Sequence, residues 1–195
     1  LIVAVGGGSV MDVAKLACLD MGVGRGVRDL LEAPQAAVKR YTTVMIPTTA
    51  GTGSEATPNS IVSVPERQVK VGIVNEQMLP DFVILDGAMI KNLPAPVAAA
   101  TGMDALCHAV ECYTSLKANP FSDLFALEAI RLILPNLPKA CLDPEAMAEK
   151  NSMLLAAFYG GVAIASSGTT AVHALSYPLG GRHHIPHGIA NAKLL

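Results

Sequence analysis

The pattern of apolar residues changes near Lys91, and this change restricts the possible folds strongly. Before Lys91, short runs rich in Val and Ile are bounded by Gly, Pro, Asn or Asp, which is typical of strands. After Asn92 the spacing and the proline positions indicate helices only. We therefore expect an α/β domain over residues 1–91 and an all-helical domain over residues 92–195, packed tightly because no linker composition separates them.

The individual elements follow from the same signals. Strands are predicted at Leu1–Val5, Thr42–Ile46, Ser60–Val64, Val69–Val74 and Phe82–Leu85. The first and last of these runs are continuously apolar, which is typical of parallel strands covered on both faces. Helices are predicted from Pro94 and Pro96 to about Tyr113, from Asn119-Pro120 to Pro135, over Pro144–Tyr159 and over Thr169–Leu175.

Composition excludes several classes of partner. The chain has 195 residues with a net charge of −2, 14 Lys and Arg, and 4% aromatic residues, so it lacks the basic surface that nucleic acids require. Residues 151–181 contain no Asp, Glu, Lys or Arg. Their apolar part, Met153–Ala165, is shorter than the roughly 20 residues of a membrane span. We expect a buried helix there, and no membrane partner.

The cysteines indicate the cellular compartment that we expect, and the chain ends indicate whether we expect a longer protein. Cys18, Cys107, Cys112 and Cys141 form no CxxC pair and lie in apolar stretches. This pattern favours buried thiols in a reducing compartment, and we expect a cytoplasmic protein. The chain begins without Met inside a predicted strand and ends without a helix stop signal, so we expect an internal fragment of a longer protein.

A glycine loop follows the first predicted strand. Gly6-Gly7-Gly8-Ser9 is succeeded by Val10–Lys15, which has helical spacing. A strand, a glycine turn and a helix start allow the backbone to approach a pyrophosphate, whose charge is favoured by free N–H groups. The loop is not GxGxxG, and an ordinary tight turn is the alternative.

A second loop, residues 47–55, follows the strand Thr42–Ile46. It carries four hydroxyl side chains and two glycines but no Walker lysine: Thr48, Thr49, Thr52 and Ser54, with Gly51 and Gly53. Hydroxyls of this kind suit phosphate, ribose or carboxamide groups, although a Ser/Thr-rich turn is the alternative. Loops after two parallel strands lie at the same sheet edge, which favours a nucleotide site. Lys70, on a predicted strand, is by itself typical of a solvated edge residue.

One carboxylate and several histidines have ligand-like spacing in the helical half. Asp104 and His108 are four residues apart and share a helix face that also carries apolar residues. His173 ends the uncharged run, and His187 lies between Pro186 and Gly188 in what we predict to be a rigid turn. These four residues predict a site for Fe²⁺, Zn²⁺ or Mn²⁺, with a simple hydrogen-bonded pair as the alternative.

Other candidates near this site are weaker. We expect His183 and His184 at a loop surface, because adjacent residues do not easily face one ion. Cys107 and Cys112 are softer possible ligands, but small buried thiols are the simpler interpretation.

Four motifs together resemble a known family. GGGSVMDVAK (6–15), PTTAGTGSEAT (47–57), TGMDALCHAVECY (101–113) and HALSYPLGGRHHIPHGIANAKLL (173–195) are similar, in order and separation, to motifs of the iron-containing, group III alcohol dehydrogenases. The resemblance implies metal ligation by Asp104, His108, His173 and His187. It implies cofactor binding by Gly7, Gly8, Ser9, Asp12, Thr48, Thr49, Thr52, Ser54 and Lys70, which reverses the preference for a solvated Lys70. Tyr177 stands where many members have histidine, so no catalytic residue is assigned.

The resemblance also implies a fold and an activity. The fold would be a dehydroquinate synthase-like pair of domains, both incomplete here. The activity would be interconversion of a small-molecule alcohol and an aldehyde or ketone with NAD or NADP and a divalent metal, Fe²⁺ being the first expectation. We also expect a homo-oligomer.

Two alternatives stay open: a dehydroquinate synthase-like lyase and a non-catalytic fragment that binds nucleotide or metal. The lyase requires several Lys and Arg near the metal, and residues 151–181 supply none. The residue that selects NAD or NADP is expected upstream of Leu1.

Overall fold

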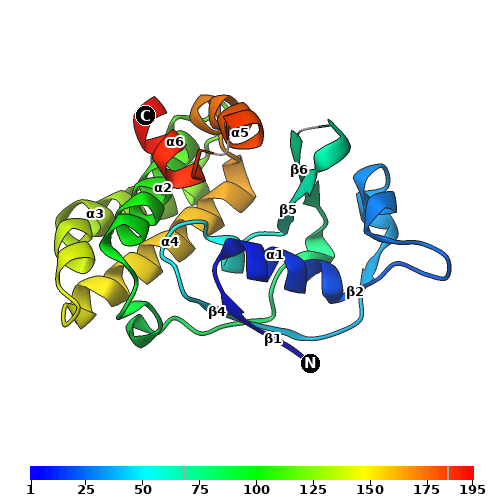
Figure 1. The fold of residues 1–195 in the computed structure, drawn as a ribbon, viewed down its shortest axis with the longest axis horizontal. Helices are drawn as coiled ribbons and strands as arrows, with labels where there is room; N and C mark the ends of the chain where they lie inside the picture. Colours follow the sequence, from blue (N-terminus) through cyan, green and yellow to red (C-terminus); the bar gives the residue numbers. More distant parts are fainter. Residues whose placement is uncertain (68, 184) are drawn as a thin grey trace.

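The first half of the chain is built on a three-stranded parallel sheet (Figure 1). The computed structural model describes residues 1–67, 69–183 and 185–195. The sheet has the order β1-β4-β7, with strands Ile2–Gly6, Thr43–Pro47 and Phe82–Val83. In β1 and β4 the register runs from Ile2 opposite Thr43 to Gly6 opposite Pro47. Helix α1 (Gly8–Ala17) follows β1 directly, as predicted.

Only one face of this sheet is covered. Met11 and Ala14 of α1 pack against Ala4 and Met45. On the other face Val3 and similar side chains are exposed, because no described element packs there. The prediction of two covered faces is therefore wrong for this chain, although the parallel pairing is confirmed.

The other predicted strands lie outside the sheet. Strands β5 (Asn59–Val64) and β6 (Val69–Val74) form an antiparallel hairpin of their own. A short antiparallel pair, β2 (Leu19–Asp20) and β3 (Val38–Lys39), was not predicted. The connections contain short 3-10 helices: η1 Val27–Leu31, η2 Pro34–Ala36, η3 Ser54–Ala56, η4 Pro65–Arg67, η5 Glu76–Met78 and η6 Gly87–Ile90.

The second half is helical, with α2, α3 and α4 packed side by side (Figure 1). Its described helices are α2 Ala95–Thr114, α3 Pro120–Leu142, α4 Met147–Ser167, α5 Ala171–His183 and α6 His187–Leu194. Alanines dominate their contacts, among them Ala105, Ala129 and Ala157. Small side chains let these helices approach closely, and Ile133 and Leu154 fill the remaining space.

Several helix ends differ from the prediction. Helix α3 continues past Pro135 and Pro138, because Leu137 packs over Gly102 of α2 and stabilises the last turns. Helices α4 and α5 are longer than predicted, and α5 runs through Pro178. The expected rigid turn at His187 is wrong: Pro186 caps a helix, α6, that begins at His187.

The two halves pack tightly, as predicted. Gly53, at φ +60°, lies against the backbone of α4, where an added Cβ would be 2.7 Å from the carbonyl oxygen of Ala157. The amide of Gly87 donates a 2.7 Å hydrogen bond to Asn151 Oδ1 on the same helix. Backbone contact this close requires glycine at position 53.

The uncharged stretch forms most of α4, α5 and their connection, and α4 has a largely buried face. No single helix among those described is long and apolar enough to cross a membrane. Helix α4 and residues Ala171–Gly181 meet the length and composition requirement only as a pair bent by 106°. Cys18, Cys107 and Cys112 are buried free thiols, as predicted, and Cys141 is half-buried.

Candidate metal and nucleotide site

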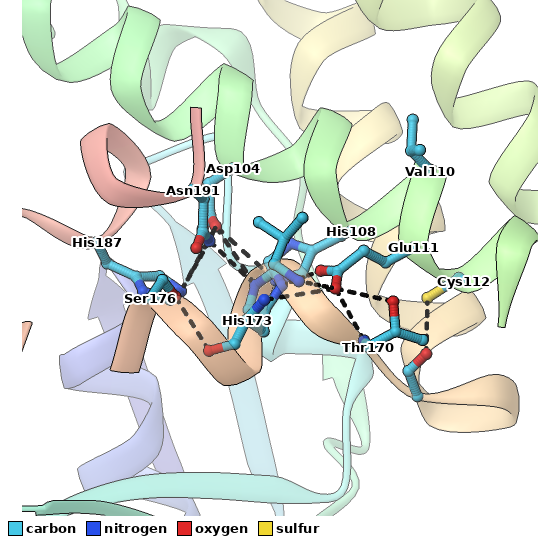
Figure 2. Close-up of polar contacts among 12 residues, drawn as sticks. Asp104, His108, Val110, Glu111, Cys112, Thr170, His173, Ser176, His187 and Asn191 are labelled. Atoms are coloured by element: carbon cyan, nitrogen blue, oxygen red, sulfur yellow. Dashed lines mark hydrogen bonds and ion pairs between the residues drawn. The ribbon is translucent and has the colours of Figure 1, made fainter. Parts of the chain in front are cut away.

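The four predicted metal ligands come together from three helices (Figure 2). Helix α2 supplies Asp104 and His108, α5 supplies His173 and α6 supplies His187. From Asp104 Oδ1 the distances to Nε2 are 3.9 Å for His108, 3.6 Å for His173 and 3.5 Å for His187. Asp104, His108 and His173 are buried, and each offers a ligand atom within 4.8 Å of the others.

The electrostatics of Asp104 favour a charged carboxylate in a buried place. Asp104 is 3% and His108 is 6% exposed. Burial disfavours the charged carboxylate, but the nearby imidazoles, with His108 first, outweigh it and hold the pKa of Asp104 well below its usual value. Burial lowers the pKa of His108 to about 4, so its imidazole is neutral. A buried carboxylate beside imidazole nitrogens is the environment that a divalent cation stabilises.

Two of the imidazoles are held at their Nδ1 atoms by acceptor groups on the far side of the ring from Asp104. His108 Nδ1 is 3.3 Å from the carbonyl oxygen of Gly51, and His173 Nδ1 contacts the Glu111 carboxylate. Because both acceptors take the proton of Nδ1, the Nε2 lone pairs face Asp104. Metal-binding histidines are commonly held in this way. Burial disfavours a second proton on His173, but Asp104 and Glu111 outweigh this and raise its pKa.

Glu111 is a site residue that sequence reasoning missed. Its Oε1 accepts hydrogen bonds from Thr170 N and Oγ1, both at 2.9 Å, and from Val172 N at 2.8 Å. Burial raises the pKa of Glu111, but the bonds from His173 and Thr170 outweigh it and the net shift is downward. Its spacing of seven from Asp104, on the same helix face, was the available signal.

Asn191 is the second missed residue. Its Nδ2 lies 2.6 Å from Asp104 Oδ1, 3.1 Å from His173 Nε2 and 3.2 Å from His187 Nε2. Its Oδ1 is buried and has no hydrogen-bond partner among the described residues. Three acceptor atoms thus converge on one donor, and an oxygen and two nitrogens in this arrangement fit a divalent cation. The spacing of four from His187 was the available signal.

One cavity of about 280 Å³ joins this cluster to both predicted nucleotide loops. It is lined by Gly8, Ser9, Asp12, Thr52, Ser54, Thr57, Asn59, Ile61, Ser63, Lys70, Asp104, His108, Ile164, Thr169, His173, Tyr177 and His187. Of the predicted cofactor residues, Gly7, Thr48 and Thr49 are not among these lining residues. Gly7 nevertheless abuts the hydroxyl loop, since a Cβ there would be 3.3 Å from Thr49 Oγ1.

A buried lysine of α1 connects this helix to the hydroxyl loop and the residues after it, and sequence reasoning missed it too. Lys15 Nζ donates to Ser54 Oγ at 2.8 Å, to Thr57 Oγ1 at 3.0 Å and to the carbonyl oxygen of Asn59 at 2.8 Å. Ser54 Oγ in turn donates to Asp12 Oδ1 at 2.8 Å. The hydroxyl proton of Ser54 is therefore already used inside the protein. Burial lowers the pKa of Lys15 to about 8.

The remaining candidates lie near the cavity or outside it. Tyr177 stacks on His187 with ring centroids 5.8 Å apart, and Lys70 is exposed but lines the cavity. Burial raises the pKa of Cys107 to about 12, which fits an unreactive buried thiol. His183 is exposed, but in α5 instead of a loop, and His184 lies outside the described residues.

Comparison with known proteins defines the class to which this combination of sheet, loops and helical metal cluster belongs. Residues 98–195 match the model of the Fe-containing alcohol dehydrogenase family, C-terminal, and residues 1–87 match the model of iron-containing alcohol dehydrogenase. The chain belongs to the Fe-containing alcohol dehydrogenase family.

Individual relatives agree. The chain is 38% identical to the 4-hydroxybutyrate dehydrogenase of Clostridium kluyveri, over 97% of this chain and 51% of the relative. It is 41% identical to the probable alcohol dehydrogenase EutG of Escherichia coli, over 100% and 49%. The chain thus spans about half the length of the curated relatives it matches.

Solved structures share the fold. The iron-containing alcohol dehydrogenase of Thermotoga maritima superposes with a TM-score of 0.86 at 41% identity, covering 97% of this chain and 51% of that one. The sulfoacetaldehyde reductase of Bifidobacterium kashiwanohense, solved with NAD⁺, has a TM-score of 0.90 at 36% identity, covering 97% and 50%. The predicted α/β part followed by a helical part is confirmed.

Proposed function

We propose that the protein containing this chain is a metal-dependent NAD(P) alcohol dehydrogenase that interconverts a small alcohol and an aldehyde or ketone. The observation that carries the proposal is the cavity that joins the glycine and hydroxyl loops to the Asp/His cluster. Related dehydrogenases support it, including an NAD-dependent methanol dehydrogenase of Bacillus methanolicus at 37% identity.

In this proposal the helical half, residues 92–195, holds the metal. The ligands are Asp104, His108, His173 and His187, and Fe²⁺ is the first expectation, with Zn²⁺ or Mn²⁺ as alternatives. A bound divalent cation supplies Lewis acidity, which lowers the pKa of an alcohol hydroxyl and polarises a carbonyl. Asp104 contributes the negative charge, and Glu111 and the Gly51 carbonyl keep two imidazoles in the ligating tautomer.

The α/β half, residues 1–91, binds the dinucleotide in this proposal. The start of α1 presents free backbone N–H groups to a pyrophosphate, with Gly7, Gly8, Ser9 and Asp12 around it. Thr48, Thr49, Thr52, Ser54 and Lys70 form the opposite side. Lys70 is the one Lys or Arg among the described lining residues, which favours a dehydrogenase over a lyase with a polyanionic substrate.

Metal and cofactor binding test the proposal separately from turnover. In the complete polypeptide, His187→Ala should lose bound Zn²⁺ and alcohol oxidation while keeping its circular dichroism spectrum and NADH fluorescence titration. His183→Ala, which alters an exposed histidine, is the matched control and should change neither. Wild-type protein that binds metal and NADH yet oxidises or reduces no alcohol, aldehyde or ketone in a broad panel would contradict the dehydrogenase activity.

A further inference from the structure

Asn191 contacts three of the four candidate ligands (Figure 2). It is 0% exposed, and its Nδ2 is within 3.2 Å of acceptor atoms on Asp104, His173 and His187, which come from α2, α5 and α6. A side-chain amide nitrogen has only two hydrogens for these three acceptors. The amide therefore acts as a shared donor that draws the three ligand atoms together.

The direction of this amide follows from its surroundings. His173 Nε2 accepts, since the Nδ1 proton is directed to Glu111. Asn191 Nδ2 lies 3.1 Å from His173 Nε2, within hydrogen-bond distance. Exchanging Nδ2 and Oδ1 would set an oxygen against acceptor atoms, 2.6 Å from Asp104 Oδ1 in the closest case. The amide nitrogen therefore faces the ligands.

A cation and this amide nitrogen compete for the same lone pairs. Zn²⁺ lies about 2.0–2.2 Å from oxygen and nitrogen ligands. Asn191 Nδ2 is 2.6–3.2 Å from these three ligand atoms, and the two imidazole nitrogens are 3.6 and 3.5 Å from Asp104 Oδ1. An atom so placed stands in or beside the position of such a cation. The amide hydrogens, which carry partial positive charge, would then face a positive ion.

We propose that Asn191 is an exchange residue of the metal site: its amide nitrogen holds Asp104, His173 and His187 together in the metal-free protein and leaves them when a divalent cation binds. The inference rests on the proposed metal site. Its consequence is that Asn191 stabilises the metal-free protein, by compensating the buried Asp104 carboxylate, and weakens metal affinity. A residue that instead stabilised the ligands around a bound metal would strengthen metal affinity.

Asn191→Ala in the complete polypeptide tests this at pH 8. Melting temperature is measured with EDTA and with saturating Zn²⁺, and Zn²⁺ affinity by competition with a chromophoric chelator. We expect the melting temperature of the metal-free variant to fall by several degrees and that of the Zn²⁺-loaded variant to equal wild type. The reason is that the substitution removes a hydrogen bond to a charged group that exists only in the metal-free protein. Zn²⁺ affinity should therefore rise about ten-fold.

The controls separate the possible failures. Asn136→Ala removes an amide that bonds Leu132 O within α3, and it should leave Zn²⁺ affinity unchanged. Asn191→Ser keeps one donor and should lie between wild type and Asn191→Ala. If metal-free Asn191→Ala does not fold, two other measurements test the inference. They are the Zn²⁺ affinity of Asn191→Ser and the rate at which Zn²⁺ dissociates from the Zn²⁺-loaded Asn191→Ala protein.

Two results overturn the inference. Weaker or unchanged Zn²⁺ binding in both variants, or a lower melting temperature of the Zn²⁺-loaded Asn191→Ala protein, would refute the exchange role while leaving the metal site intact. Wild-type protein that binds no Zn²⁺, Fe²⁺ or Mn²⁺ would refute the metal site itself, and the exchange role with it.

Discussion

Glu111 holds the His173 imidazole from the side opposite Asp104 (Figure 2). One carboxylate oxygen receives the His173 Nδ1 proton, while the other ties down the backbone at Thr170 and Val172, at the start of α5. The carboxylate therefore determines both the tautomer and the position of His173. Groups that hydrogen-bond to a metal-ligating histidine commonly have a large effect on metal affinity.

Glu111→Gln should weaken Zn²⁺ binding about 10–100-fold. Glutamine has one acceptor oxygen, so either the His173 Nδ1 proton or the backbone N–H groups of α5 would face an amide NH₂ group. Chelator competition on the complete polypeptide measures the change. Glu149→Gln, at an exposed ion pair with Lys139, is the control and should bind Zn²⁺ as wild type does. Equal affinity of Glu111→Gln and wild type would contradict this role.

Among the helices, α6 has a large effect on the candidate metal site, because it carries both His187 and Asn191 on one face. It packs directly on α2, the helix of Asp104 and His108. Gly188 allows this approach, since a Cβ there would overlap the carbonyl oxygen of Ala100. The distance between α6 and α2 thus sets the distance between ligands from the two helices.

Gly188→Ala should push α6 away from α2 and weaken Zn²⁺ binding, with a loss of about 1–3 kcal/mol in the free energy of unfolding from overpacking. Urea unfolding and chelator competition measure the two effects. Gly180→Ala is the matched control in α5, because a Cβ there meets its nearest atom, Ile185 O, at 3.7 Å. If Gly188→Ala binds Zn²⁺ as well as Gly180→Ala does, the helix contact does not position the ligands.

For the whole molecule, the contact between the halves includes η3, which packs on α4. Glu55 of η3 is 3% exposed, and burial raises its pKa to about 7, opposed in part by Lys15. The folded state therefore holds this proton more tightly than the unfolded state does. Stability from this group is present below about pH 4.5 and is lost as the pH rises towards 7.

Glu55→Gln should remove this pH dependence. We expect wild type to lose on the order of 2 kcal/mol of unfolding free energy relative to Glu55→Gln between pH 5 and pH 8. Urea unfolding of both proteins at a series of pH values measures the difference. Glu76→Gln, at an exposed position, is the control and should follow wild type. A constant difference between wild type and Glu55→Gln across this range would refute the burial effect.

Local patterns predicted much of the fold and of the candidate site. Neighbouring residues encode the order of strand, glycine loop and helix, and they also encode the i,i+4 spacing of Asp104 and His108. Both features could therefore be predicted from the sequence. The continuation of α3 beyond Pro135 was not, because its stability comes from Leu137 against Gly102 of another helix. Helix α6 was missed for the same reason: Gly188 normally disfavours a helix, and here it enables packing on α2.

The sequence by itself determined the two-part architecture, the two loops after parallel strands and the Asp104/His108 pair, because each depends on residues close together in the chain. His173 and His187 joined this pair through their own local sequence and through the resemblance of four motifs to a known family. Only the tertiary structure decided that Glu111 orients His173, that Lys15 braces Ser54 and that Asn191 lies among the ligands. Those side chains meet partners 39 to 87 positions away. A buried polar group must find a partner wherever the fold brings one, and no local pattern specifies which.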